Sequence, residues 1–176
     1  MGRRLGIGAV VLAGAAAALG MAGCTAAVSN ALDAPIQVIS ATDVAVGTSI
    51  QAVAQAAQAH LLVGGSFLGF GPASAAGTNI TSGPSGSSGE ISYSVTPGGG
   101  ALVMTGWNRA DRHCVGELYV QTALPTPVLG ITSAGQYYFV APAASSSACD
   151  AASYAATTAA PTGWPKNPSS SVWSVT

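Results

Sequence analysis

The sequence predicts an α+β domain, in which an N-terminal helix packs on an antiparallel sheet of about four strands and one disulfide is present. Residues 48–63 carry apolar side chains at helical spacing. From Glu90 onward, apolar and polar residues alternate in short segments separated by turn residues, which is typical of antiparallel strands. The chain has 176 residues, which suits one domain with a hydrophobic core better than two.

The helix is expected to span residues 48–63, with Thr48 as its N-cap and Gly64-Gly65 as its stop. Thr48 and Gln51 have the spacing of a capping box, in which both side chains bond to backbone N–H groups. Two glycines follow the apolar pattern, and glycine commonly closes a helix. Before the helix, residues 35–46 fit either helix or extended chain. The predicted apolar face comprises Ile50, Val53, Ala54, Ala57 and Leu61.

Four strands are predicted after a loop that spans residues 66–89. A turn rich in Pro and Gly separates the first strand from the second, and a charged turn separates the second strand from the third. The tail from Ala151 is rich in Ala, Ser, Thr and Pro, with Trp164 and Trp173 as expected packing anchors. The predicted strands are residues 90–96, 101–107, 113–122 and 135–140.

The N-terminus has the layout of a secretory signal. Arg3 and Arg4 precede an uncharged apolar run, and small residues then precede Cys24. The phrase Met21-Ala22-Gly23-Cys24 resembles a bacterial lipobox, with Met where Leu is usual. This resemblance implies that residues 1–23 are a lipoprotein signal peptide and that the Cys24 thiol receives diacylglycerol. Residues 24–34 would then be a lipidated tether, and residues 35–176 a single globular domain.

Two other interpretations of the leader stay open. It could be a plain signal peptide cut at another position, or an uncleaved transmembrane anchor at the short end of a bilayer span. Under all three interpretations the domain is exported. With lipid on Cys24, the protein is expected on the outer face of the bacterial cell membrane.

The chain has three cysteines, an odd number that calls for an explanation in an exported protein. Lipidation of Cys24 accounts for one of them. Outside the cytosol the remaining pair, Cys114 and Cys149, is expected to form a disulfide worth roughly 4 kcal/mol by the chain-entropy estimate. The alternative use of this pair is a metal site, but no Cys-x-x-Cys is present and histidine ligands are few.

Charge excludes nucleic acid as a partner. Only 6% of the residues are charged, where about 25% is ordinary for a soluble protein. Three basic and six acidic side chains remain after residue 23, a net charge of −3. Phosphate binding needs several clustered Lys or Arg side chains, so nucleic-acid binding is not expected.

Part of the chain resembles the globular domain of type IV pilin-like proteins and pseudopilins. The similarity covers roughly residues 48–154 and rests on Leu61-Leu62-Val63-Gly64-Gly65-Ser66-Phe67 after the helix, then Cys114, Tyr137-Tyr138 and Cys149-Asp150-Ala151. Pilins also carry a prepilin leader and keep a long hydrophobic helix, and neither feature matches this sequence. The resemblance therefore implies a pilin-like domain reused on a lipid anchor.

No catalytic constellation is evident, and the protein is expected not to be an enzyme. A Ser/His/Asp triad needs a positioned histidine; the sequence supplies only His60, expected to have no role, and His113. Glu90 and Glu117 are expected to be solvated surface, not a glycosidase pair. We predict no cofactor and no metal site.

The one dense charged cluster comprises Arg109, Asp111, Arg112 and His113. It is expected either to be a solvated hairpin turn or to contact an anionic envelope protein or wall polymer. The expected role is therefore non-enzymatic, structural or interactive, at the cell envelope. The alternative is a ligand-binding lipoprotein that uses a sheet face lined by Trp107, Tyr93, Tyr137 and Phe139.

Overall fold

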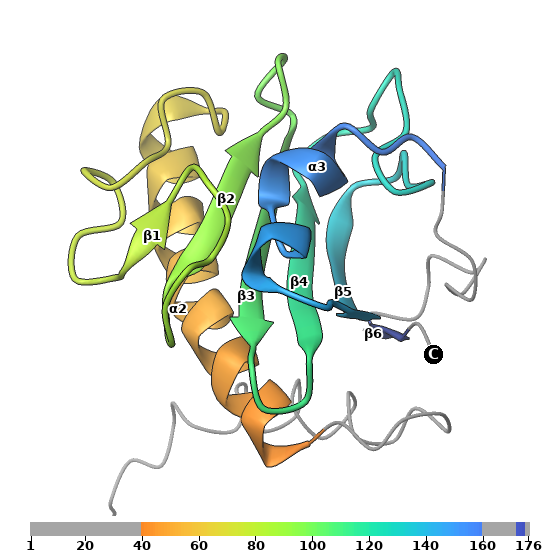
Figure 1. Ribbon diagram of the computed structural model, residues 1–176. Helices are drawn as coiled ribbons and strands as arrows, with labels where there is room; N and C mark the ends of the chain where they lie inside the picture. The colour runs from red at the N-terminus through yellow and green to blue at the C-terminus, as the bar shows by residue number, and fades with distance from the viewer. Residues whose placement is uncertain (1–39, 160–171, 175–176) are drawn as a thin grey trace, which may run out of the picture.

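The computed structural model describes residues 40–159 and 172–174 (Figure 1). The predicted signal peptide, the lipidation site Cys24, residues 24–34 and Trp164 lie outside this part. The elements in chain order are α2 (Ala41–Gly64), β1 (Ile80–Thr81), β2 (Ile91–Val95), β3 (Ala101–Asn108), β4 (His113–Val120), β5 (Gly135–Pro142), a 3₁₀ helix (Ser146–Ala148), α3 (Ala151–Ala155) and β6 (Val172–Ser174).

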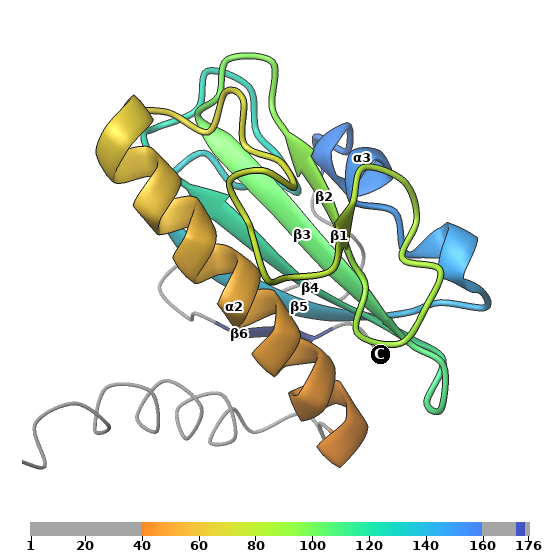
Figure 2. The ribbon, with the colours of Figure 1, turned by 90° about the vertical axis from the view of Figure 1, so that its left-hand side faces the viewer.

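The sheet follows the order of the chain, β1-β2-β3-β4-β5-β6. Strands β2 to β5 form an antiparallel meander, while the short β1 and β6 pair in parallel at the two edges. Helix α2 lies across β3 and β4 on one face (Figure 2). The α+β class, the helix on an antiparallel sheet and the four central strands are confirmed. The parallel edge strands were not predicted.

Helix α2 begins earlier than predicted. Ser40 is its N-cap and forms a capping box with Asp43, in which each side chain bonds to the other residue's backbone N–H. Thr48, predicted as the N-cap, lies inside the helix and donates to the carbonyl of Val44. The usual capping box has Glu or Gln at the position that Asp43 takes here. The Ser-x-x-Asp pattern departs from that rule and was therefore overlooked in the sequence. The end is as predicted, because Gly65 closes the helix in the left-handed conformation with φ 69°.

A close approach brings α2 onto the sheet. A Cβ atom built on Gly106 of β3 would lie 2.4 Å from Val46 Cγ1 and 2.9 Å from Ile91 Cδ1. Only glycine therefore fits where the helix crosses the strand. The interface is filled by apolar side chains of both layers, including Ile50, Val53, Ala57, Phe67, Phe70, Ile91, Leu102 and Met104.

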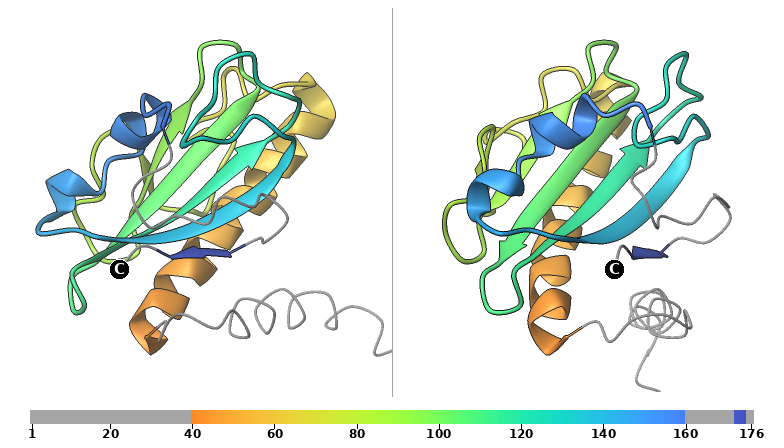
Figure 3. Two further views of the ribbon diagram at one scale, coloured as in Figure 1. Left: turned by 90° about the vertical axis from the view of Figure 1, so that its right-hand side faces the viewer. Right: turned by 45° about the vertical axis from the view of Figure 1, so that its right-hand side comes forward.

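The other face of the sheet is covered by the segment after β5, including α3 (Figure 3). This helix was not predicted, because the chain from Ala151 was described only as a tail rich in Ala, Ser, Thr and Pro. Asp150 caps it by accepting from the backbone N–H groups of Ala152 and Ser153. Buried side chains on this face include Val103, Leu118, Val120, Tyr137, Phe139 and Ala151.

The predicted disulfide is present between Cys114 of β4 and Cys149, just before α3. Both cysteines are fully buried. The bridge therefore ties the segment that covers the second face of the sheet to a central strand, and it rules out a metal site on this pair.

Candidate functional site

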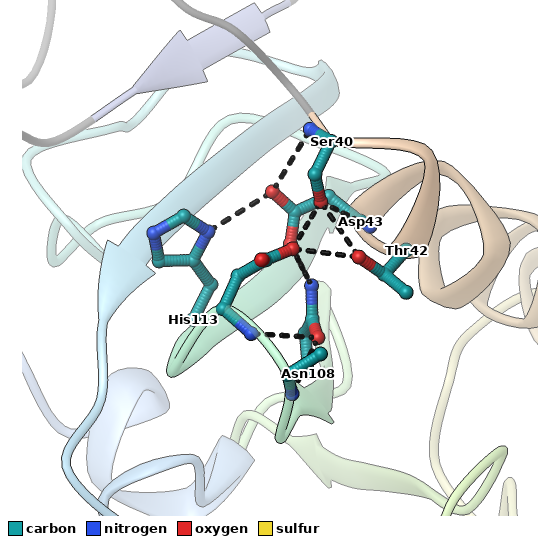
Figure 4. Close-up of polar contacts among 7 residues, drawn as sticks. Ser40, Thr42, Asp43, Asn108 and His113 are labelled. Atoms are coloured by element: carbon teal, nitrogen blue, oxygen red, sulfur yellow. Dashed lines mark hydrogen bonds and ion pairs between the residues drawn. The ribbon is translucent and has the colours of Figure 1, made fainter.

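Polar side chains converge where the N-terminus of α2 meets the turn between β3 and β4 (Figure 4). Strand β3 ends at Asn108 and β4 begins at His113. The Asn108 side-chain oxygen accepts from the backbone N–H groups of Ala110 and Asp111, which folds the turn back on itself. The turn ends at Arg112, which has a positive φ of 56°. This geometry holds Asp111 and His113 beside the start of the helix.

Asp43 is the buried centre of this network. It lies in the first turn of α2 and is only 1% exposed. Its Oδ1 accepts from Asn108 Nδ2 at 2.6 Å, and its Oδ2 accepts from His113 Nδ1 at 3.0 Å. The Ser40 backbone N–H also donates to Oδ2. One carboxylate thus joins a helix N-terminus to two strands far away in the sequence.

Asp111 approaches the same point from the turn. Its Oδ2 accepts from Ser40 Oγ, from Thr42 Oγ1 at 2.6 Å and from Asn108 Nδ2 at 2.9 Å. These three hydrogen bonds, the one from Ser40 first, favour the charged form and lower the pKa of Asp111 to about 2. Asp111 is therefore a carboxylate at any ordinary pH.

The network is rich in negative charge. Its two carboxylates face a single basic side chain, and His113–Asp43 is the only ion pair within residues 40–159 and 172–174. Arg109 and Arg112 lie in the turn itself and are both exposed, but neither pairs with these carboxylates. The predicted charged cluster therefore divides, because only Asp111 and His113 meet.

Several members of the network were missed at the sequence level. Asp43 and Asn108 are 65 residues apart, and Asp43 and His113 are 70 apart. No local pattern links residues at such separations. The one usable signal was the Ser-x-x-Asp box of Ser40 and Asp43, which locates the helix start but not its partners.

A groove of about 730 Å³ lies beside the network. Its walls are the first half of α2, the loop 86–89 and residues 107–110. Thr42 and Asn108 belong both to the groove and to the network. Among the described residues that line it, Arg109 is the one that carries a charge. The groove therefore offers an open, mostly neutral surface with a single positive charge.

The predicted aromatic sheet face does not exist as one surface. Tyr93 pairs in register with Met104 and packs on the α2 side of the sheet. Tyr137 and Phe139 are buried in the cluster on the opposite side, and Trp107 packs near the disulfide. Cross-strand partners share a face, so the alternation that predicted the strands also separates Tyr93 from the other three side chains. Apolar side chains fill the interface on both faces of the sheet.

Three other residues considered in the sequence, His60, Glu90 and Glu117, have structural surroundings. His60, expected to have no role, donates from Nε2 to the Leu68 carbonyl and accepts at Nδ1 from Ser74 Oγ, so it ties α2 to the loop that follows it. Glu90 accepts from the backbone N–H groups of Gly86 and Ser87. Glu117, expected to be solvated, is instead 0% exposed. It pairs in register with Met104 and so points into the interface under α2.

Comparisons of the sequence with known protein families, with curated proteins and with solved structures found no match. Within the part of the chain that the structure describes, no helix combines the length and the apolar character needed to cross a bilayer.

Proposed function

We propose that this protein is an exported lipoprotein, anchored through lipid on Cys24 to the outer face of the bacterial cell membrane. The observation that carries the proposal is the bridge between Cys114 and Cys149. Disulfides persist mainly in oxidising compartments outside the cytosol. The bridge also leaves Cys24, the cysteine of the lipobox-like phrase, as the single remaining thiol of the chain.

The anchor is tested by replacing Cys24 with Ser. In the producing bacterium, C24S is expected to leave the membrane fraction and to lose incorporation of labelled palmitate, because serine cannot form the thioether to diacylglycerol. The matched control is Ser29→Ala, which alters the following segment but leaves the lipobox-like phrase intact. Continued membrane retention of C24S would show that the leader is an uncleaved span.

The proposed role at the envelope is structural or interactive and not enzymatic. The His113 Nδ1 atom is bonded to the buried Asp43, and both ring nitrogens of His60 bond to structural partners. Within the described residues no carboxylate orients His60 toward Ser74, as a hydrolase triad would require. The order of elements, a helix followed by an antiparallel meander and a disulfide-closed segment, supports the proposal of a pilin-like domain held on a lipid anchor.

The contact surface is the groove with Arg109, which would meet an anionic envelope protein or polymer. It is tested by crosslinking in intact envelopes and purifying the tagged protein. We expect a specific partner with the wild type, its loss with Arg109→Ala/Arg112→Ala, and its retention with Arg109→Lys/Arg112→Lys, because lysine keeps the charge. Identical recovery from the alanine and lysine variants would contradict a contact through these side chains.

A further inference from the structure

We propose that Asp43, Asp111 and His113 form a binding site for a divalent transition-metal ion, for which Zn²⁺ is the best-suited candidate. The site goes beyond the envelope role proposed above and does not depend on it. It joins three segments that are separate in the sequence: the first turn of α2, the β3–β4 turn and the start of β4 (Figure 4).

The geometry brings one ligand atom from each residue to one place. A carboxylate oxygen of Asp43, a carboxylate oxygen of Asp111 and a ring nitrogen of His113 all lie within 4.8 Å of one another. Asp43 Oδ2 and His113 Nδ1 are 3.0 Å apart. Two ligands that each lie about 2.0–2.2 Å from a tetrahedral zinc ion are separated by roughly 3–3.5 Å. Small side-chain shifts therefore convert this arrangement into a coordination shell.

The charge of the cluster favours a cation. Asp43 is almost completely buried, and a buried carboxylate is costly unless it is paired. Hydrogen bonds from Thr42 and Asn108 hold the second carboxylate, that of Asp111, beside it. Two carboxylates face one basic side chain here and leave an excess of negative charge, because neither Arg109 nor Arg112 forms an ion pair with them. A divalent ion would cancel that charge.

The hydrogen bonds within the cluster are compatible with a bound ion. Hydroxyl groups rotate, so Ser40 and Thr42 can turn their protons away and present lone pairs. His113 can carry its proton on Nε2 and offer the Nδ1 lone pair, since the tautomer follows the partner. Asn108 Nδ2 donates to both carboxylates and would keep doing so, which fixes their orientation around the ion.

The types of ligand atom and the exposure of the site to solvent indicate which kind of ion would bind. An imidazole with two carboxylates suits Zn²⁺ or a similar transition ion, whereas Ca²⁺ and Mg²⁺ prefer oxygen ligands alone. The His113 side chain is 34% exposed and Asp111 is at the surface, so an ion can enter and water can complete the shell. Neighbouring Cys114 is fixed by the disulfide, which limits movement of the strand that carries His113.

The test uses the full chain in detergent, stripped with EDTA, dialysed and titrated with ZnCl₂ by calorimetry. We expect one Zn²⁺ per chain and a higher Tm on binding. His113→Gln and Asp111→Asn should each weaken affinity at least tenfold, while His60→Gln, a histidine outside the site, should bind like the wild type. CaCl₂ should bind at least tenfold more weakly than ZnCl₂.

A spectroscopic measurement separates coordination from nonspecific binding. With CoCl₂ in place of ZnCl₂, the wild type should develop d–d absorption bands, and His113→Gln should lose them. The two site variants, His113→Gln and Asp111→Asn, replace partly or fully exposed side chains. The test therefore does not depend on changing the buried Asp43. The absence of saturable Zn²⁺ binding by the wild type, or His113→Gln binding with wild-type affinity, would overturn the proposal.

Discussion

Replacing Glu117 with Met is expected to stabilise the protein, and more at pH 8 than at pH 5. Glu117 is fully buried beneath α2, and neither carboxyl oxygen has a hydrogen-bond partner. A buried polar group without a partner costs roughly 1–3 kcal/mol even when neutral. Met has a similar shape and no such group, so E117M should fit the apolar interface around Met104.

The pH dependence follows from the same burial, which raises the pKa of Glu117 from 4.5 to about 8. Between these values the folded protein holds a proton that the unfolded chain has released. The free energy of unfolding therefore falls as pH rises from about 4.5 to about 8, by an amount on the order of a few kcal/mol. Below this window the group is protonated in both states, and above it the penalty stays constant.

Urea unfolding at pH 5, 6.5 and 8 measures both effects. The wild type should lose stability across the series, whereas E117M and E117Q should lack most of that slope. E117Q keeps a buried polar group and should therefore be less stable than E117M. Glu90→Gln is the control, because that carboxylate accepts two backbone hydrogen bonds near the surface. A wild-type slope that persists in E117M would show that other groups cause it.

A second readout comes from Tyr138, the cross-strand neighbour of Glu117. Burial first, and then the charge of Glu117, raise the pKa of Tyr138 to about 12. E117M removes the charge and leaves the burial. An ultraviolet titration should therefore show one tyrosine whose pKa falls in E117M and stays in Glu90→Gln.

Glu117 also shows where sequence patterns stop being informative. Strand β4 was predicted correctly from Val115, Leu118 and Val120, but its solvated face was not, because helices cover both sides of the sheet. Alternation identifies a strand that has one wet face. It cannot show that both faces are covered, by α2 over Glu117 and by α3 over Leu118 and Val120, since α3 lies in a segment whose composition resembles a tail.

Only part of the polar network could likewise be predicted from the sequence. The sequence placed Asp111 and His113 in one charged turn, because they are two residues apart. It could not place Asp43 there, because that contact depends on how α2 crosses the sheet, which Gly106 determines by letting Val46 approach. Local chemistry was therefore predicted, while the juxtaposition that gives the site its charge required the tertiary fold.

The second large effect is expected from the disulfide. Replacing both Cys114 and Cys149 with Ala should lower the free energy of unfolding by roughly 4 kcal/mol, because the cross-link no longer restricts the unfolded chain. The loss should concentrate around α3. The Cys149 carbonyl accepts from the Ser85 N–H and from Thr105 Oγ1, so the bridge also positions a hydrogen-bonded junction.

Reduction gives an independent route to the same state. Dithiothreitol should lower the Tm of the wild type to near that of the double alanine variant, and should not change the Tm of that variant. Limited proteolysis should then cut first between β5 and α3, whose attachment to β4 depends on the bridge. If thiol titration shows full reduction but the Tm is unchanged, the apolar contacts of Ala151 and Tyr154 hold this segment without the cross-link. The bridge would then be a mark of the oxidising compartment more than a source of stability.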